Sequence, residues 1–115
     1  MADATSDQLE MCRKHGVPPD APDSLTKLGI SRSFSSREFP LNGLRHPAEE
    51  GTNGWFLWSG EELSTDPDFF VPLHAMHVDD HCPEIKKYLA LPPGWRFLYA
   101  PDQEYVWFDE SLFKL

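Results

Sequence analysis

The segment that most constrains the fold lies between Cys82 and Glu110. It has the pattern of a helix, an abrupt stop, and two strands joined by a tight turn. Pro83 suits the first position of a helix, because its missing N–H would have no partner there, and the run Pro92-Pro93-Gly94 ends the helix. Apolar residues between these prolines recur at steps of three and four, which is typical of a helix that packs through one side. We therefore predict a helix over residues 83–91.

The residues after this helix predict a β-hairpin. Residues 95–100 alternate between aromatic and other side chains, residues 101–104 have turn chemistry, and residues 105–108 are aromatic and β-branched. Both faces carry bulky side chains, so we expect at least one of the two strands to lie inside a larger sheet. The predicted core anchors of the hairpin are Trp95, Phe97 and Trp107.

Three further strands are predicted upstream of the helix. Segments 25–34 and 54–58 are rich in large apolar residues, and the second is apolar enough to be buried on both faces. Segment 69–73 contains Pro72, which makes it an edge strand or marks the end of the strand. With the hairpin, these strands predict an α+β fold: one small domain with an antiparallel or mixed sheet of four to five strands and a helix packed on one face.

The chain has 115 residues, a length that favours a single domain, and its N-terminal region is predicted to precede the main fold. Residues 1–16 can form a short helix with Ser6 or Asp7 as its N-cap, and a connector rich in Pro and Asp follows. We therefore divide the chain into an N-terminal helix and connector, residues 1–23, and an α+β domain, residues 24–115. Inside that domain, residues 35–53 are predicted to be mostly irregular.

The charge of the chain limits the partners that it could bind. Ten basic and nineteen acidic residues give a net charge of −9 at pH 7. This charge disfavours nucleic acid and anionic membranes as direct ligands and suits a basic protein partner, but solubility alone would explain it equally well. Cys12 and Cys82 do not make a disulfide framework, and neither a signal peptide nor an apolar run of membrane-spanning length is found. We predict a cytoplasmic protein with reduced thiols.

The run from His74 to His81 is the strongest candidate for a metal site. It holds three histidines and two aspartates, all of them possible metal ligands. It fits neither the H-x-H-x-D-H run of metallo-hydrolases, because Ala75 and an extra aspartate intrude, nor the H-E-x-x-H motif. We favour the alternative that the histidines flank a strand–helix junction and that Asp79 and Asp80 cap the helix. No metal and no cofactor is therefore predicted.

No motif in the sequence predicts catalysis. Carboxylate pairs at 61–62, 66–68 and 109–110 could act as acid and base, but their spacing favours solvated turn and cap residues. A nucleophile elbow, a phosphate-binding glycine loop and a dinucleotide fingerprint are all missing from the sequence. We assign no catalytic residue. The four tryptophans are predicted to lie in the core or, where exposed, to anchor an interface: Trp55, Trp58, Trp95 and Trp107.

Three short motifs in the middle of the chain carry a family resemblance. They are Arg37-Glu38-Phe39-Pro40-Leu41-Asn42, then Asn53-Gly54-Trp55 followed by Gly60-Glu61-Glu62, then Asp66-Pro67-Asp68. Their order and spacing resemble the pattern R-E-x-P-x-N, D-S-G-W, G-x-E and D-P-D of immunity-protein family thirty-three of bacterial polymorphic toxin systems, formerly a domain of unknown function. The chain resembles a subgroup similar to that family over about residues 30–115, and it departs from the pattern at Thr52-Asn53 and at Phe56.

The resemblance implies a protein that binds and neutralises a toxin and performs no catalysis of its own. The implied partner is a protein toxin, and the net charge of −9 predicts that the toxin has a basic contact face. We expect an acidic and aromatic contact surface, with the candidate residues Trp58, Glu61, Glu62, Asp66, Asp68, Asp109 and Glu110. The alternatives are a small metal-dependent hydrolase or metal-binding protein that uses the His74–His81 run, and an interaction module without a toxin partner.

Overall fold

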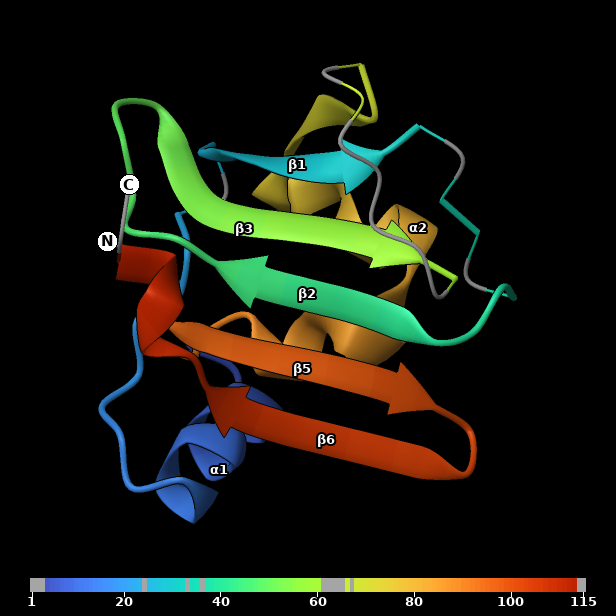
Figure 1. Cartoon of the computed structure of the whole chain (residues 1–115). Coiled ribbons are helices and arrows are strands. Elements are labelled where there is room, and N and C mark those ends of the chain that lie inside the picture. The colour runs from blue at the N-terminus through green and yellow to red at the C-terminus, as the bar shows by residue number, and fades with distance from the viewer. Residues whose placement is uncertain are drawn as a thin grey trace.

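The strands form one mixed sheet that is covered by helices on one face (Figure 1). The computed structural model describes residues 4–23, 25–32, 34–35, 37–60, 66 and 68–113, without the side chain of Asp79. In this part of the chain the sheet has six strands, in the order β4-β1-β3-β2-β5-β6. Neighbours β1 and β3 run parallel, and the other neighbouring pairs are antiparallel. The strands are β1 (Lys27–Ser31), β2 (Leu41–Arg45), β3 (Thr52–Ser59), β4 (Phe70–His74), β5 (Trp95–Ala100) and β6 (Gln103–Phe108).

The helices of the described residues are short, and most of them lie behind the sheet in Figure 1. They are α1 (Ser6–Lys14), the 3-10 helix η1 (Ala75–His77), α2 (Val78–His81), and the 3-10 helices η2 (Pro83–Tyr88) and η3 (Glu110–Phe113). Helix α1 packs against η2, whereas η3 follows β6 and packs its Leu112 on the opposite face of the sheet. Among the described residues, no helix has the length and apolar character needed to cross a membrane.

The α+β class with a mixed sheet is confirmed, but the sheet is larger than the four to five strands predicted. The difference is β2, which lies inside the segment 35–53 that the sequence predicts to be mostly irregular. Asn42 and Gly43 have low strand propensity, so the local pattern hides this strand. Packing requires the glycine, because a Cβ at Gly43 would lie 2.2 Å from the Phe97 ring. The predicted edge position of the Pro72 strand is confirmed, since β4 is the first strand in the order.

The helix predicted over residues 83–91 is wrong in its form. In its place, α2 ends at His81 and the 3-10 helix η2 begins at Pro83. Between them Cys82 is extended, with φ −160° and ψ 85°, and Pro83 has no N–H with which to continue the α-helical bonds. The predicted apolar side is nevertheless buried, because Ile85 and Tyr88 have the three-residue spacing that a 3-10 helix also places on one side.

Helix α1 begins one residue earlier than the sequence predicts. Its N-cap is Thr5 rather than Ser6 or Asp7: Thr5 Oγ1 accepts a hydrogen bond from Gln8 N (3.2 Å), and Gln8 Oε1 accepts one from Thr5 N (2.9 Å). This reciprocal pair is a capping box. Gln8 also donates to Lys86 O (2.9 Å), so the start of α1 is tied to η2.

The main core lies between the sheet and the helices. Tyr88 of η2 stacks on Phe97 of β5 with ring centroids 4.3 Å apart, and Trp55 of β3 lies 5.7 Å from the same ring. The prediction of Phe97 as a core anchor is confirmed, and Trp95 is half-buried against this core. The prediction for Trp107 is wrong, because its side chain is 37% exposed on the edge strand β6.

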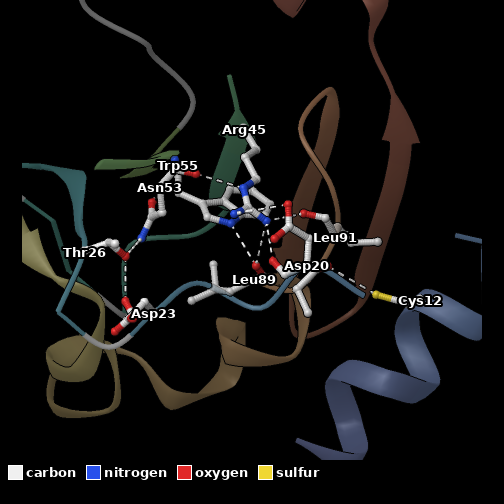
Figure 2. A network of polar contacts seen from close by, with 10 residues as sticks. Cys12, Asp20, Asp23, Thr26, Arg45, Asn53, Trp55, Leu89 and Leu91 are labelled. Atoms are coloured by element: carbon white, nitrogen blue, oxygen red, sulfur yellow. Dashed lines mark hydrogen bonds and ion pairs between the residues drawn. The ribbon is translucent and has the colours of Figure 1, made fainter. Parts of the chain in front are cut away.

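A buried arginine joins three separate parts of the chain (Figure 2). Arg45, at the end of β2, is 3% exposed, and its Nε donates to Asn53 O of β3 (2.9 Å). Its Nη1 donates to Asp20 O in the connector after α1 (2.7 Å) and to Leu91 O after η2 (2.8 Å). The guanidinium also lies 5.7 Å from the centroid of the Trp55 ring. Burial lowers the pKa of Arg45, and the Asp20 carboxylate opposes that shift.

Replacing the stacked aromatic ring should test the placement of the core. We expect Phe97→Ala to lower the free energy of unfolding by about 3–5 kcal/mol, as for a fully buried aromatic side chain. Trp107→Ala is the matched control and should cost less than about 1 kcal/mol, because its ring is partly in water. Urea denaturation of dilute protein measures both values, and equal losses in the two variants would contradict this assignment of the core.

Replacing the buried arginine should test its role as a junction. Arg45→Met keeps the length of the side chain but removes every donor, so the carbonyl groups of Asp20, Asn53 and Leu91 lose their partner. We expect a loss of at least about 2 kcal/mol in the free energy of unfolding, since the acceptors of Asn53 and Leu91 are buried and each unsatisfied buried acceptor costs about 1–3 kcal/mol. Arg37→Met, at an exposed position, is the control and should stay within about 0.5 kcal/mol of the original protein. A loss as small as that of the control would show that water replaces the guanidinium at no cost.

Candidate partner-binding surface

The face of the sheet opposite the helices carries a second cluster of apolar side chains. Strand alternation points Phe56 and Trp58 of β3 toward this face, beside Phe70 of β4. The ring centroids of Phe56 and Phe70 are 5.1 Å apart, and those of Trp58 and Phe70 are 6.4 Å apart. Leu44 of β2 and Leu112 of η3 complete the cluster. This face, called the open face below, is therefore apolar at its centre.

An apolar cavity of about 520 Å³ opens beside this cluster. A Cβ at Gly29 would lie 2.7 Å from the Phe56 ring, so only glycine lets that ring lie against β1 at the floor of the cavity. His46 Nδ1 lies 3.0 Å from Leu112 O, a hydrogen bond that holds η3 at the rim. Other lining residues are Lys27, Pro47, Glu49, Phe70, Pro72 and Phe113. A concave site of this kind can accept an apolar side chain of a partner, as interface hot spots do.

The other end of η3 is anchored by a carboxylate. Arg96 Nη1 of β5 lies 3.0 Å from Asp109 Oδ2, and its guanidinium sits 5.2 Å from the centroid of the Trp107 ring. Ser111 donates two hydrogen bonds to Asp109 Oδ1, from its N (3.0 Å) and from its Oγ (2.6 Å). The bonds from Ser111 and then those from Arg96 lower the pKa of Asp109. Asp109 therefore stays ionised and links β5, β6 and η3.

The predicted partner-binding residues fall into two groups at opposite corners of the sheet. Trp58, Asp66 and Asp68 lie where β3 ends and just before β4 begins, whereas Asp109 and Glu110 follow β6 at the other edge and the other end. In Figure 1, β3 ends on the right and β6 ends on the left. Trp58 is 4% exposed, because it belongs to the apolar cluster. Glu61 and Glu62 lie outside the described residues.

The described acidic candidates differ in what their carboxylates already bind. Asp109 is held by Arg96 and Ser111, as above. Asp66 Oδ1 accepts a hydrogen bond from Asp68 N (2.9 Å), which shapes the turn before β4. The carboxylates of Asp68 and Glu110 are exposed, and neither is in an ion pair within the described part of the chain. These two are the candidates whose charge is available to a partner.

The histidine run lies on the surface around η1 and α2. The rings of His74 and His77 have centroids 6.2 Å apart, and His77 Nδ1 lies 3.3 Å from Asp80 Oδ2. Among the described residues, no three His, Cys, Asp or Glu side chains converge as a metal site would require. The histidines do flank the strand–helix junction, but neither α2 nor η2 has a side-chain N-cap among those residues, so the described Asp80 is not the predicted cap.

Both cysteines are buried thiols that donate hydrogen bonds. Cys82 Sγ donates to Glu84 Oε2 (2.9 Å), and Cys12 Sγ donates to Ala90 O (3.4 Å). Burial, and after it the bond to Glu84, raises the pKa of Cys82 to about 12, and burial raises the pKa of Cys12 as well. Thiols with raised pKa values are poor nucleophiles at neutral pH, so neither cysteine supports covalent chemistry.

Comparison with family models places the chain in a family. The model of the Imm33-like domain matches residues 7–109, a span that runs from α1 to the residue after β6. The chain belongs to the Imm33-like family. The resemblance carried by the three sequence motifs is thereby confirmed. Searches of curated proteins and of solved structures give no match.

Two of the three motifs that carry the Imm33-like resemblance come together in space and have structural roles. Asn42 Nδ2 donates to Gly60 O (2.9 Å), and Gly60 N donates to Glu38 O (3.2 Å), so two motifs distant in sequence meet at one end of β2 and β3. Asn53 Oδ1 accepts a hydrogen bond from Trp55 N (3.1 Å) at the start of β3. The described residues of the first two motifs therefore build the β2–β3 pair that supports the open face, and those of the third form the turn before β4.

Sequence reasoning did not find the cavity. Its floor combines residues of β1, β3 and β4, and its rim includes η3 and the loop between β2 and β3. The sequence does give one indication at Phe56 and Phe70, because large aromatic residues at strand positions on one face are typical of an interface as well as of a core. Their contact depends on β1 lying between β3 and β4, which no local pattern shows.

A carboxylate on β6 should make stability depend on pH. The Tyr88 hydroxyl donates to Glu104 Oε2, and Lys87 Nζ lies 3.2 Å from the same oxygen. The bond from Tyr88 lowers the pKa of Glu104, and Lys87 lowers it further. Because the folded pKa lies below the unfolded value, this stabilisation is present above the unfolded pKa and is lost as the pH falls through the folded pKa.

We therefore expect Glu104→Gln to be less stable than the original protein at pH 7. The difference should shrink as the pH falls below the ordinary glutamate range of about 4.3, where the original carboxylate also becomes protonated. Glu10→Gln, at an exposed position of α1, is the control. Urea midpoints at several pH values measure the effect, and a constant difference across the acid range would show that Glu104 does not act through its charge.

Proposed function

We propose that this protein is an immunity protein that neutralises a bacterial toxin by stoichiometric binding, without catalysis of its own. The observation that carries the proposal is the Imm33-like family match over residues 7–109. The apolar open face and its cavity support the proposal, because a protein that acts by binding needs a place where a partner can bury an anchor side chain. Such a protein would meet its toxin in the cytoplasm.

The open face is the proposed contact surface for the toxin. The described acidic candidates lie at opposite corners of the sheet, and a partner that lies across the open face would reach both corners. The net charge of −9 favours a toxin with a basic contact face, whose approach the carboxylates would accelerate. The proposed contact residues are those that the sequence predicts: Trp58, Glu61, Glu62, Asp66, Asp68, Asp109 and Glu110. To them we add Phe113, which lines the cavity and is 50% exposed.

The function can be tested by capture followed by reconstitution. A tagged copy is used to purify its protein partner from the native bacterial lysate, and the purified pair is then recombined. We expect a complex with one toxin per chain, and we expect toxin activity to disappear when the two proteins are equimolar. A partner whose activity is unchanged in the complex, or turnover of a small molecule without any protein partner, would contradict the proposal.

Two variants and their controls should then locate the contact surface. We expect Phe113→Ala to weaken toxin binding at least about tenfold, as for a central apolar anchor, while Leu9→Ala on α1 has no effect. We expect Asp68→Lys to slow association most at low salt, while Asp7→Lys on α1, with the same change of net charge, does not. Surface plasmon resonance at two salt concentrations measures both effects. If the control substitutions on α1 had equal effects, the contact surface would not be the open face.

A further inference from the structure

Strand β6 leaves one edge of the sheet unpaired. It is the last strand in the order, so no described strand pairs with its outer side. Gln103 pairs with Ala100 across a tight turn, and pairing with β5 continues to Phe108 without a register shift. In an antiparallel ladder, bonding alternates along the strand. Gln103, Tyr105 and Trp107 therefore bond to β5, and the N–H and C=O groups of Glu104, Val106 and Phe108 point outward.

The two edges of the sheet differ in how they are protected. The edge strand β4 contains Pro72, which has no N–H to offer to another strand. Strand β6 has the sequence Gln-Glu-Tyr-Val-Trp-Phe, without proline, lysine or a β-bulge, which are common devices against edge-to-edge pairing. Only the β6 edge is therefore open to a further strand among the described strands.

Exposed aromatic surface is concentrated on this same strand. Tyr105 (56% exposed) and Trp107 (37% exposed) lie on the open face, and Phe108 (50% exposed) lies on the opposite face, because side chains alternate along the strand. Phe108 meets Phe113 with ring centroids 6.0 Å apart, so a second exposed aromatic pair lies where β6 ends. Contiguous exposed apolar residues on a protein surface mark an interaction site more often than scattered ones do.

The charges along this edge cancel locally, although the chain as a whole carries −9. Glu104 is paired with Lys87 (3.2 Å), and Asp109 is paired with Arg96 (3.0 Å). A second copy of the chain, which also carries −9, meets the least repulsion where charges are already paired. A basic partner gains nothing from such a neutral edge. The β6 edge therefore suits a second copy of this chain better than it suits a basic protein.

We propose that β6 pairs antiparallel with β6 of a second copy, about a two-fold axis at Val106. In this register Val106 faces Val106 of the partner copy, and Glu104 faces the partner copy's Phe108, so all three outward-pointing residues form backbone hydrogen bonds. On the open face, Tyr105 of each copy faces Trp107 of the other, an aromatic pair that occurs twice. Among the paired residues 104–108 no like charges are directly opposed, and the contact is isologous, as in most homodimers.

The axis of this pairing is perpendicular to the sheet, because opposed residues of paired strands lie on the same face. The two copies would therefore form one continuous sheet, with both open faces on one side and both helical layers on the other. Each copy keeps its own cavity in this arrangement. The dimer does not depend on a toxin, so its test is independent of the proposed function.

The mass of the purified full chain in solution tests the proposal. Sedimentation equilibrium from about 1 µM to about 1 mM should show a reversible shift from the 13.2 kDa monomer to twice that mass. Tyr105→Lys removes both aromatic pairs and should weaken the dimer at least about tenfold. His74→Lys, at an exposed position of the opposite edge strand β4, makes the same change of net charge and should leave the dimer unchanged. Circular dichroism confirms that both variants are folded.

Hydrogen exchange of the unaltered protein gives a second readout. The amides of Glu104, Val106 and Phe108 should exchange more slowly as the protein concentration rises, because they are bonded only in the dimer. Those of Tyr105 and Trp107, which bond to β5, should not change with concentration. A chain that stays monomeric to about 1 mM would overturn the proposal and leave this edge to a strand of another protein. A dimer that His74→Lys disrupts and Tyr105→Lys does not would also overturn it.

Discussion

The burial of the Arg45 guanidinium is the constraint on which the rest of the structure depends. Its donors satisfy carbonyl groups of the connector after α1, of β3 and of the segment after η2, and the last two would otherwise be buried without a partner. Trp55 adds to the same junction, because its indole N–H donates to Leu89 O (2.9 Å). The network continues through Asn53 to Thr26 at the start of β1 (Figure 2). One side chain thus holds the helical layer on one face of the sheet.

This one-sided arrangement leaves the open face and one edge of the sheet available for binding. Among the described residues, the helices other than η3 lie on the face that holds Tyr88 and Phe97, and η3 with the aromatic cluster covers part of the other face. The cavity beside Phe56 arises where that cover ends. The available edge is β6, because β4 is protected by Pro72 and the remaining strands are internal.

In this Imm33-like protein, the first two family motifs and the exposed surfaces lie in different parts of the fold. The first two motifs that carry the family resemblance build the β2–β3 pair, because Asn42 donates a hydrogen bond to Gly60 O. These motifs therefore stabilise the sheet. The cavity-lining Phe113 lies outside these motifs, whereas the exposed Asp68 belongs to the third motif and lies just before β4. The exposed edge of β6 is a separate surface. It suits a second copy of the chain because Glu104 and Asp109 are already paired with Lys87 and Arg96.

The sequence alone determined the α+β class, the hairpin of β5 and β6, the edge position of β4 and the family, because these depend on local periodicity, on prolines and on short motifs. It did not predict β2. Glycine is needed at Gly43 because a Cβ there would clash with the Phe97 ring of the neighbouring strand, and this requirement is unrelated to strand propensity. The sequence also failed at Trp107, since period two does not show which strand of a hairpin ends a sheet. The cavity and the open β6 edge were decided only by the tertiary structure, because both depend on the order in which strands distant in sequence lie side by side.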